Sequence, residues 1–168
     1  MKKLRIGWFT FTCCEDNSIL FVELLNKNYF IWKKLVDFRY CKFIKSHNVF
    51  DEFDVAFIEG AISNDRDRKK LEDIRARSKY LVAVGACACG GYPSAQRNDF
   101  PDNIKIKIKP FLDKWNLYEK VLRVDEVVKV DDKVDGCPMV EATFIKTLEK
   151  YLKLFGIVTE EKDAQPKL

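Results

Sequence analysis

The sequence predicts an α/β fold in which a mainly parallel β-sheet carries helices on both faces, and three observations lead to this prediction. Short apolar runs suited to buried strands recur along the chain. Segments with apolar residues at helical spacing lie between them. Glycines and small polar residues follow several of the strand-like runs, as in binding loops. Strands that alternate with helices form a parallel sheet through right-handed crossovers, and ligands then bind beyond the carboxyl ends of the strands.

The first half of the chain contains three strand-like runs and two helical segments. Asn17 or Ser18 can cap the first helix, and Phe21 lies off its predicted inward stripe. In the second helix, Leu71 and Ile74 are the inward anchors. The predicted stripe of the first helix consists of Ile19, Val22, Leu25 and Tyr29. The predicted elements are a strand at 3–11, a turn at 12–17, a helix at 18–35, strands at 36–44 and 53–58, and a helix at about 64–79.

The second half opens with an apolar run at 80–84, which predicts a buried strand, and a loop of small residues with two cysteines follows it. The alternation of Ile and Lys at 104–110 suggests a strand, but Pro110 and the apolar group after it would also suit an irregular helix, so both alternatives stay open. A last strand is predicted at 127–130, and Pro138 fits the first position of the helix after it. That helix is expected to display on one face Val140, Phe144, Leu148 and Leu152.

Length and composition indicate one soluble globular domain. The chain has 168 residues, of which 47% are hydrophobic and 33% charged. We predict a single domain over 1–158 and a polar tail at 159–168. The net charge of +4 is spread along the chain, which argues against a nucleic-acid partner. No apolar stretch approaches the roughly 18 residues of a membrane span, and no signal-peptide core is visible. The expected location is cytoplasmic, where a partner could hold the protein at the inner membrane face.

Six cysteines and a single histidine shape the expected chemistry. Disulfides rarely persist in a reducing compartment, so metal ligation or redox chemistry is the more economical use of the thiols. The single histidine, His47, is predicted at the surface, which argues against mixed histidine–cysteine zinc sites. Cys41 falls inside a predicted strand and is expected to be a small buried hydrophobe.

The remaining cysteines follow three strand-like runs, so one sheet edge could present them together. A 4Fe-4S cluster needs ligands at four iron corners, whereas structural zinc would more naturally show Cys-x-x-Cys pairs, which this chain lacks. Neighbouring residues of a strand point to opposite faces, so tandem cysteines can share a cluster only where the backbone turns sharply. The candidate ligands are Cys13, Cys14, Cys87 and Cys137, with Cys89 as a spare for Cys87.

Three further loop residues have two interpretations each. Glu15 and Glu59 are expected to be solvated loop carboxylates, with a role in proton movement as the alternative. Arg97 either pairs with a partner's carboxylate or is simply exposed.

Cys137 precedes the last predicted helix, whose positive end could stabilise a negatively charged cluster.

Four motifs follow one another along the chain: the first cysteine turn, Phe-Ile-Glu-Gly at 57–60, Gly-Ala-Cys-Ala at 85–88 with Gly-Gly at 90–91, and Gly-Cys-Pro at 136–138. In their order and spacing, these motifs resemble the small subunits of nickel-iron hydrogenases, in a cytosolic form with a single cluster, and the related 20 kDa subunit of complex I. The resemblance covers roughly residues 4–150. It implies a flavodoxin-like three-layer sandwich. It also implies one proximal 4Fe-4S cluster on Cys13, Cys14, Cys87 and Cys137, beside a large catalytic or quinone-site subunit and with further electron-transfer subunits.

The first loop leaves two branches of this superfamily open. Many hydrogenase small subunits have Cys-x-x-Cys there, and aligning Cys14 with its first member puts Asn17 where the second cysteine belongs. The complex I relatives have tandem cysteines, which Cys13 and Cys14 match, and this alignment completes four thiolates.

The function expected from the resemblance is that of an electron-transfer subunit of a nickel-iron hydrogenase, non-catalytic by itself. A complex I-like subunit that passes electrons toward quinone or an ion-pumping module is the alternative. A zinc-binding or thiol-sensing interaction module is the alternative from another class.

Overall fold

The computed structural model describes residues 2–158 and contains a five-stranded sheet with the strand order β2-β1-β3-β4-β5. Each neighbouring pair of these strands is parallel. This is the flavodoxin-like order, so the predicted α/β fold with a mainly parallel sheet is confirmed. The strands are β1 (Leu4–Thr10), β2 (Val36–Cys41), β3 (Phe53–Glu59), β4 (Ser78–Val84) and β5 (Asp132–Val134).

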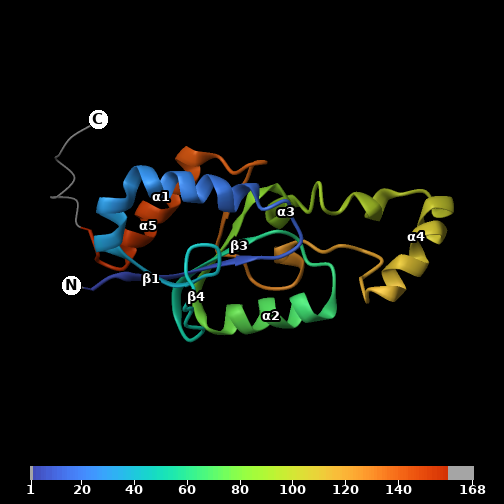
Figure 1. Cartoon of the computed structure of the whole chain (residues 1–168), viewed down its shortest axis with the longest axis horizontal. Helices are drawn as coiled ribbons and strands as arrows, with labels where there is room; N and C mark the ends of the chain where they lie inside the picture. Colours follow the sequence, from blue (N-terminus) through green and yellow to red (C-terminus); the bar gives the residue numbers. More distant parts are fainter. Residues whose placement is uncertain (1, 159–168) are drawn as a thin grey trace.

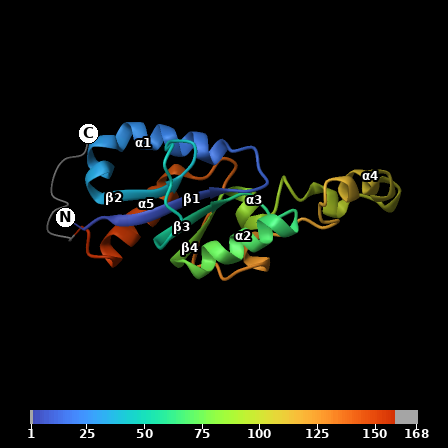
Figure 2. The ribbon, with the colours of Figure 1, turned by 60° about the horizontal axis from the view of Figure 1, so that its bottom comes forward.

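Helices cover both faces of the sheet and give the three layers. In Figure 1, α1 and α5 lie over one face and α2 lies under the other. Figure 2 shows α4 standing away from the sheet at one end of the molecule. The helices are α1 (Asp16–Leu35), α2 (Asp65–Ala76), α3 (Gly85–Gly90), α4 (Asp102–Lys114) and α5 (Glu141–Leu154), with two short 3-10 turns at Gln96–Asp99 and Val124–Glu126.

The core under α1 and α5 is aromatic, and it corrects the predicted stripe of the first helix. Trp8 of β1 stacks on Phe21 at 4.5 Å between ring centroids, and Phe144 of α5 packs edge-on against both rings. Phe21, Leu24 and Trp32 are therefore buried, whereas Ile19 and Tyr29 of the predicted stripe are exposed. Because α1 is apolar around much of its circumference, its sequence is compatible with two buried faces. Packing against Trp8 and Phe144 buries the face that carries Phe21.

The segment at 104–110 belongs to α4, so the helical alternative is right and the strand is wrong. The Ile–Lys alternation places Ile104 and Ile108 half-buried and Ile106 on the exposed side of the same helix. Leu112 is the buried anchor of α4. Pro110 lies inside the helix, where its ring removes one backbone donor.

The last strand is β5, five residues later than predicted at 127–130. Val127 and Val128 instead pack, half-buried, against the core on the α2 side. Asp131 fixes the start of β5, because its carboxylate accepts from the Leu81 backbone N–H and from Arg75. A polar anchor of this kind carries no strand-like pattern, which is why the apolar run before it misled the prediction.

Several element ends also differ from the predicted ones. Pro138 lies outside α5, which begins at Glu141, and Val140 is exposed at the cap position while Phe144, Leu148 and Leu152 are buried. In α2 the predicted anchors Leu71 and Ile74 are buried, and Asn64 caps the helix by accepting from the Asp67 N–H at 2.8 Å. The shifted boundaries are those of β2, which ends at Cys41, β3, which reaches Glu59, β4, which begins at Ser78, and α2, which ends at Ala76. The predicted tail at 159–168 lies outside the described residues.

Candidate metal centre

The carboxyl ends of four strands lie side by side, and this register brings the cysteine loops to one edge. Thr10 of β1 pairs with Glu59 of β3, Glu59 pairs with Val84 of β4, and Val84 pairs with Val134 of β5. The loops that carry Cys13, Cys14, Cys87 and Cys137 leave β1, β4 and β5 directly after these residues. The expected presentation of three cysteine loops at a common edge is therefore what the sheet register provides.

The first loop stays extended for two residues and then turns sharply. Thr12 exchanges backbone hydrogen bonds with Ala61, at 3.0 Å and 2.9 Å. Glu15 then adopts a left-handed conformation with φ 66°, from which α1 begins. Cys13 is half-buried and Cys14 is exposed on this turn. The backbone thus makes the sharp turn that the tandem cysteines require.

The second loop is a short helix, α3, and not the open loop that its glycines suggested. Cys87 lies in a small buried cluster of Ala61, Ala95 and Val121, against which Cys13 packs. The hydroxyl of Ser94 lies 2.9 Å from the Thr12 carbonyl oxygen and 3.2 Å from Cys87 Sγ. These contacts join the Cys87 segment to the Cys13 turn.

Cys89 lies on the other side of α3 from Cys87. Its sulfur is 3.5 Å from the Ala83 carbonyl oxygen, and the side chain packs in the core cluster on the α2 side. Two residues along a helix turn the side chain by roughly 200°. Helical spacing, which a loop would not impose, therefore separates Cys89 from the cysteines of the site.

The third loop is a tight turn around Cys137. Gly136 has φ +121°, and a Cβ there would lie 2.5 Å from the Pro138 carbonyl oxygen, so this position requires glycine. The Gly136 carbonyl accepts from the Ala86 N–H at 2.8 Å, which ties the turn to the start of α3. Cys137 itself is exposed.

The sulfurs influence one another's protonation. Desolvation by neighbouring protein atoms raises the pKa of Cys137 first, and the nearby thiols of Cys14 and Cys87 raise it further. Burial and then the charge of Glu59 raise the pKa of Cys13 to about 12. In the absence of a cation Cys13 is thus a neutral thiol at pH 7, and metal binding must displace its proton. Within residues 2–158, no group of three or more His, Cys, Asp or Glu side chains is arranged to hold a metal ion.

Glu59 is the largest departure from the prediction at this edge. The carboxylate, expected in solvent, is fully buried at the end of β3. It accepts from the backbone N–H of Asn17 at 3.1 Å, from Asn17 Nδ2 at 2.9 Å and from the Ser18 hydroxyl at 2.5 Å. Glu15, by contrast, is exposed as expected.

Glu59 therefore accepts from the start of α1, the role that the sequence predicted for Asn17 or Ser18 as a local cap. Glu15 offers no side-chain cap, and Asn17 and Ser18 lie inside the first helical turn, where they are buried. A carboxylate from another strand satisfies the orphan donor of Asn17 and faces the positive end of the helix. The sequence feature that could have indicated this burial is a carboxylate, Glu59, at the end of an otherwise mostly apolar strand. Its donors at Asn17 and Ser18 are about forty residues away in sequence, so the pattern around Glu59 does not reveal them.

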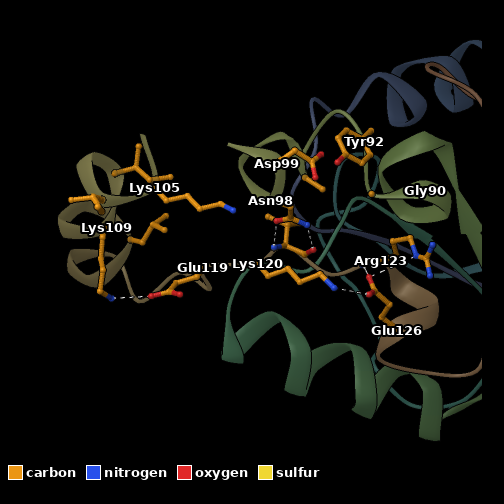
Figure 3. Close-up of a pocket in the computed structure, with 16 residues that line it drawn as sticks. Gly90, Tyr92, Asn98, Asp99, Lys105, Lys109, Glu119, Lys120, Arg123 and Glu126 are labelled. Atoms are coloured by element: carbon orange, nitrogen blue, oxygen red, sulfur yellow. Dashed lines mark hydrogen bonds and ion pairs between the residues drawn. The ribbon is translucent and has the colours of Figure 1, made fainter. Parts of the chain in front are cut away.

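A cavity of about 670 Å³ separates α4 from the body of the molecule (Figure 3). Gly90, Gly91 and Tyr92 line it on the body side, and none of its lining residues is a cysteine. Figure 3 shows Lys105 directed from α4 toward the body, and the Lys109–Glu119 and Lys120–Glu126 ion pairs at its margin. The cavity adjoins the Cys87 segment but is separate from the cysteine edge.

Arg97 is not simply exposed, as one of its two interpretations had it. The side chain is half-buried, its Nη2 donates to the Tyr118 carbonyl oxygen at 2.8 Å, and burial lowers its pKa. It fixes the segment after α3 to the segment that follows α4.

A family model and several known proteins match this chain over most of its length. The family model described as NADH ubiquinone oxidoreductase, 20 Kd subunit, matches residues 14–151. A subunit of the F420-non-reducing hydrogenase of Methanothermobacter thermautotrophicus is 26% identical over 153 residues, which are 82% of this chain and 49% of that protein. The sulfhydrogenase 2 subunit delta of Pyrococcus furiosus is 29% identical over 140 residues, 80% of this chain and 56% of that protein. The chain thus spans about half the length of the curated relatives it matches.

Solved structures share the fold. A chain in the crystal structure of an NAD+-reducing [NiFe]-hydrogenase superposes with a TM-score of 0.78 at 24% identity, covering 90% of this chain and 92% of that chain. A chain of the Ni-Fe-Se hydrogenase from Desulfomicrobium baculatum gives a TM-score of 0.63 at 18% identity, covering 99% of this chain and 67% of that chain. At 24% and 18% identity, these two matches show that the chains share a fold and show nothing beyond the fold.

Proposed function

The chain belongs to the family of the 20 kDa subunit of NADH ubiquinone oxidoreductase and is similar to hydrogenase subunits, and on that premise we propose that it is an electron-transfer subunit of a nickel-iron hydrogenase. In this proposal one proximal 4Fe-4S cluster is bound by Cys13, Cys14, Cys87 and Cys137. The cluster supplies one-electron redox chemistry when bound. The chain has no catalytic residue of its own in this role, and bond chemistry belongs to a separate large subunit.

The observation that carries the proposal is the common edge of the sheet, where three cysteine loops are hydrogen-bonded to one another. Ala86 donates to Gly136, and Ser94 joins Thr12 to Cys87. The candidate donors there are thiols, without a histidine, which is the donor set of a 4Fe-4S cluster. The small cluster of Ala61, Ala95 and Val121 behind Cys87 excludes water from the inner side of the site.

The tandem alignment is favoured over Cys-x-x-Cys by the surroundings of position 17. Asn17 is buried, and both polar atoms of its side chain already have hydrogen-bond partners. Cys13 packs toward Cys87, so it supplies the thiolate that position 17 does not.

Exposed apolar side chains beside the cysteines support a partner that covers this edge. Ile19, Tyr92 and Val140 are all exposed, and each lies within five residues of a candidate ligand. Cys14 and Cys137 are exposed as well, so a cluster bound there needs a cover against solvent. The proposed cover is the large subunit of the hydrogenase, with further electron-transfer subunits that relay electrons onward. The proposed location is the cytoplasm, and a partner could hold the complex at the inner membrane face. No helix within residues 2–158 is long and apolar enough to cross a membrane.

A complex I-like subunit that passes electrons toward quinone or an ion-pumping module is the second candidate. The tandem cysteines Cys13 and Cys14 favour it, as does the family model that the chain matches. Identification of the large subunit that co-purifies with the chain separates the two candidates.

Iron and sulfide analysis of anaerobically reconstituted protein tests the ligand set. The proposal predicts about four irons per chain. Cys13→Ser and Cys14→Ser should each lower the iron content or change the spectrum, and Cys41→Ser is the matched control because Cys41 lies in the core. A wild-type protein that takes up one zinc and no iron would favour the zinc-binding alternative. Unchanged iron and spectrum in Cys13→Ser, with loss in Cys14→Ser, would contradict the tandem assignment.

A further inference from the structure

We infer that Asn17 is a positioning residue, a buried amide that holds the three cysteine segments together and sets the separation of the Cys14 and Cys137 sulfurs. The inference rests on the proposed function, because it concerns the spacing of the proposed ligands. Asn17 itself is not a ligand in this account.

The side chain of Asn17 bridges two segments that are distant in sequence. Its Nδ2 donates to Glu59 Oε1 at 2.9 Å, and its Oδ1 accepts from the Met139 N–H at 2.7 Å. Met139 lies two residues after Cys137, and Asn17 lies three residues after Cys14. The amide therefore links the first cysteine turn to the last one through a single buried group.

The third segment, α3, begins against the same amide. Gly85 has φ +82°, and a Cβ at that position would lie 2.3 Å from Asn17 Nδ2. Real Cβ atoms do not approach a neighbour so closely, so Gly85 is needed for α3 to start where it does. Cys87 follows two residues later. All three cysteine segments thus meet at Asn17.

The chemistry of the position suits asparagine and few other residues. One end of the side chain must donate to a carboxylate and the other must accept from a backbone N–H, which an amide does and a carboxylate or an alkyl group does not. The side-chain oxygens of Glu59 accept from neutral donors, the Asn17 backbone N–H, Asn17 Nδ2 and the Ser18 hydroxyl. An aspartate at 17 would bring a second charge to Glu59 and lose the Nδ2 donor.

Glu59 in turn connects Asn17 to the core of the sheet. Its other oxygen accepts from the Ser18 hydroxyl, which accepts from Trp8 Nε1 at 3.0 Å. Trp8 is packed among the aromatic rings of β3, α1 and α5. The amide is therefore held on a rigid support, as a group that fixes the spacing of others must be.

The test compares Asn17→Ala and Asn17→Asp with Asn28→Ala in metal-free protein. Asn28 is the matched control, because it is a half-buried amide of the same helix that donates only to the Leu24 carbonyl at 2.9 Å. Two readouts are used: amide hydrogen exchange at Met139, and the rate at which a short bifunctional thiol reagent joins Cys14 to Cys137. Asn17→Ala removes the acceptor of the Met139 N–H, so it should accelerate exchange at Met139 by about tenfold or more and slow the cross-link. Asn17→Asp keeps that acceptor but loses the Nδ2 donor to Glu59, so it should slow the cross-link, while Asn28→Ala changes neither readout.

The comparison with core amides separates positioning from general stability. If exchange in β3 accelerates as much as exchange at Met139, Asn17 is a general stabilising residue and the inference is overturned. Wild-type rates in Asn17→Ala would overturn it as well. Iron uptake by the wild-type protein is measured separately, so a failure of the proposed cluster is distinguishable from a failure of the role assigned to Asn17.

Discussion

The cysteines of this protein fall into two groups, which differ in their burial and in the element that carries them. Cys41 and Cys89 are buried in the sheet core, whereas Cys14 and Cys137 are exposed at the edge where three loops meet. The sequence indicated this division for Cys41, which falls inside a strand-like run, but not for Cys89, which shares the run and the small-residue segment of Cys87 and is separated from it only by the helical geometry of α3. It did not allow the burial of Glu59, because a carboxylate is stable inside a protein only with donors, and its donors come from a distant segment.

Cys41 should make the protein less stable in alkali. Burial raises the pKa of this thiol from 9.0 to about 12. The folded state then binds the proton more tightly than the unfolded chain, so the stabilising contribution is complete below about pH 9 and is lost as the pH rises toward 12. The expected slope is about 1.4 kcal/mol per pH unit.

Urea denaturation of metal-free wild-type and Cys41→Ala protein under reducing conditions checks this effect. The difference in free energy of unfolding between the two proteins should shrink as the pH rises from about 9 to 11. A difference that stays constant over this range would contradict the assigned burial effect.

At the scale of elements, periodicity identified the helices and strands better than it identified their inward faces. The stripe predicted for α1 was wrong at Ile19 and Tyr29, which are exposed, whereas Val22 and Leu25 are half-buried. Packing against Trp8 buries Phe21 in their place. The α4 segment carries a strand-like alternation, yet it forms a helix away from the sheet, where no neighbouring strand offers hydrogen bonds. Patterns of period two identify a strand only where a sheet edge is available to it.

Two phenylalanines of α1 provide a direct test of the corrected stripe. Phe21 is 1% exposed and Phe30 is 73% exposed. Phe21→Ala should lower the free energy of unfolding by about 3–5 kcal/mol, because it leaves a cavity among aromatic rings. Phe30→Ala should change it by about 0.5 kcal/mol or less. Equal losses in a denaturant titration of the two variants would contradict the inward placement of Phe21.

At the scale of the whole molecule, the parallel sheet explains why cysteines far apart in sequence come together. Right-handed crossovers return each strand in the same direction, so every carboxyl end faces one edge. That convergence followed from the predicted fold, before any distance was known. The register that aligns Thr10, Glu59, Val84 and Val134 did not, because it is set by the pairing and packing of strands that are distant in sequence.

The proposed partner surface makes a prediction at this scale. Val140 and Leu154 are 54% and 55% exposed on the two ends of the α5 region, and only Val140 adjoins a candidate ligand. Val140→Asp should weaken co-purification of the large subunit at least tenfold, because it places a charge in the covered edge. Leu154→Asp should leave co-purification unchanged, and both variants should keep wild-type iron content. Equal retention of the partner by both variants would place the interface elsewhere.

Electron paramagnetic resonance of the anaerobically reduced protein tests whether four thiols from three loops hold one 4Fe-4S cluster. We expect a signal that integrates to about one unpaired spin per chain, since a single cluster accepts one electron. The signal should be lost or altered in Cys137→Ser and retained in Cys41→Ser. If the reconstituted wild-type protein binds iron and Cys137→Ser gives the same signal as the wild type, Cys137 is not a ligand and the proposed ligand set is wrong.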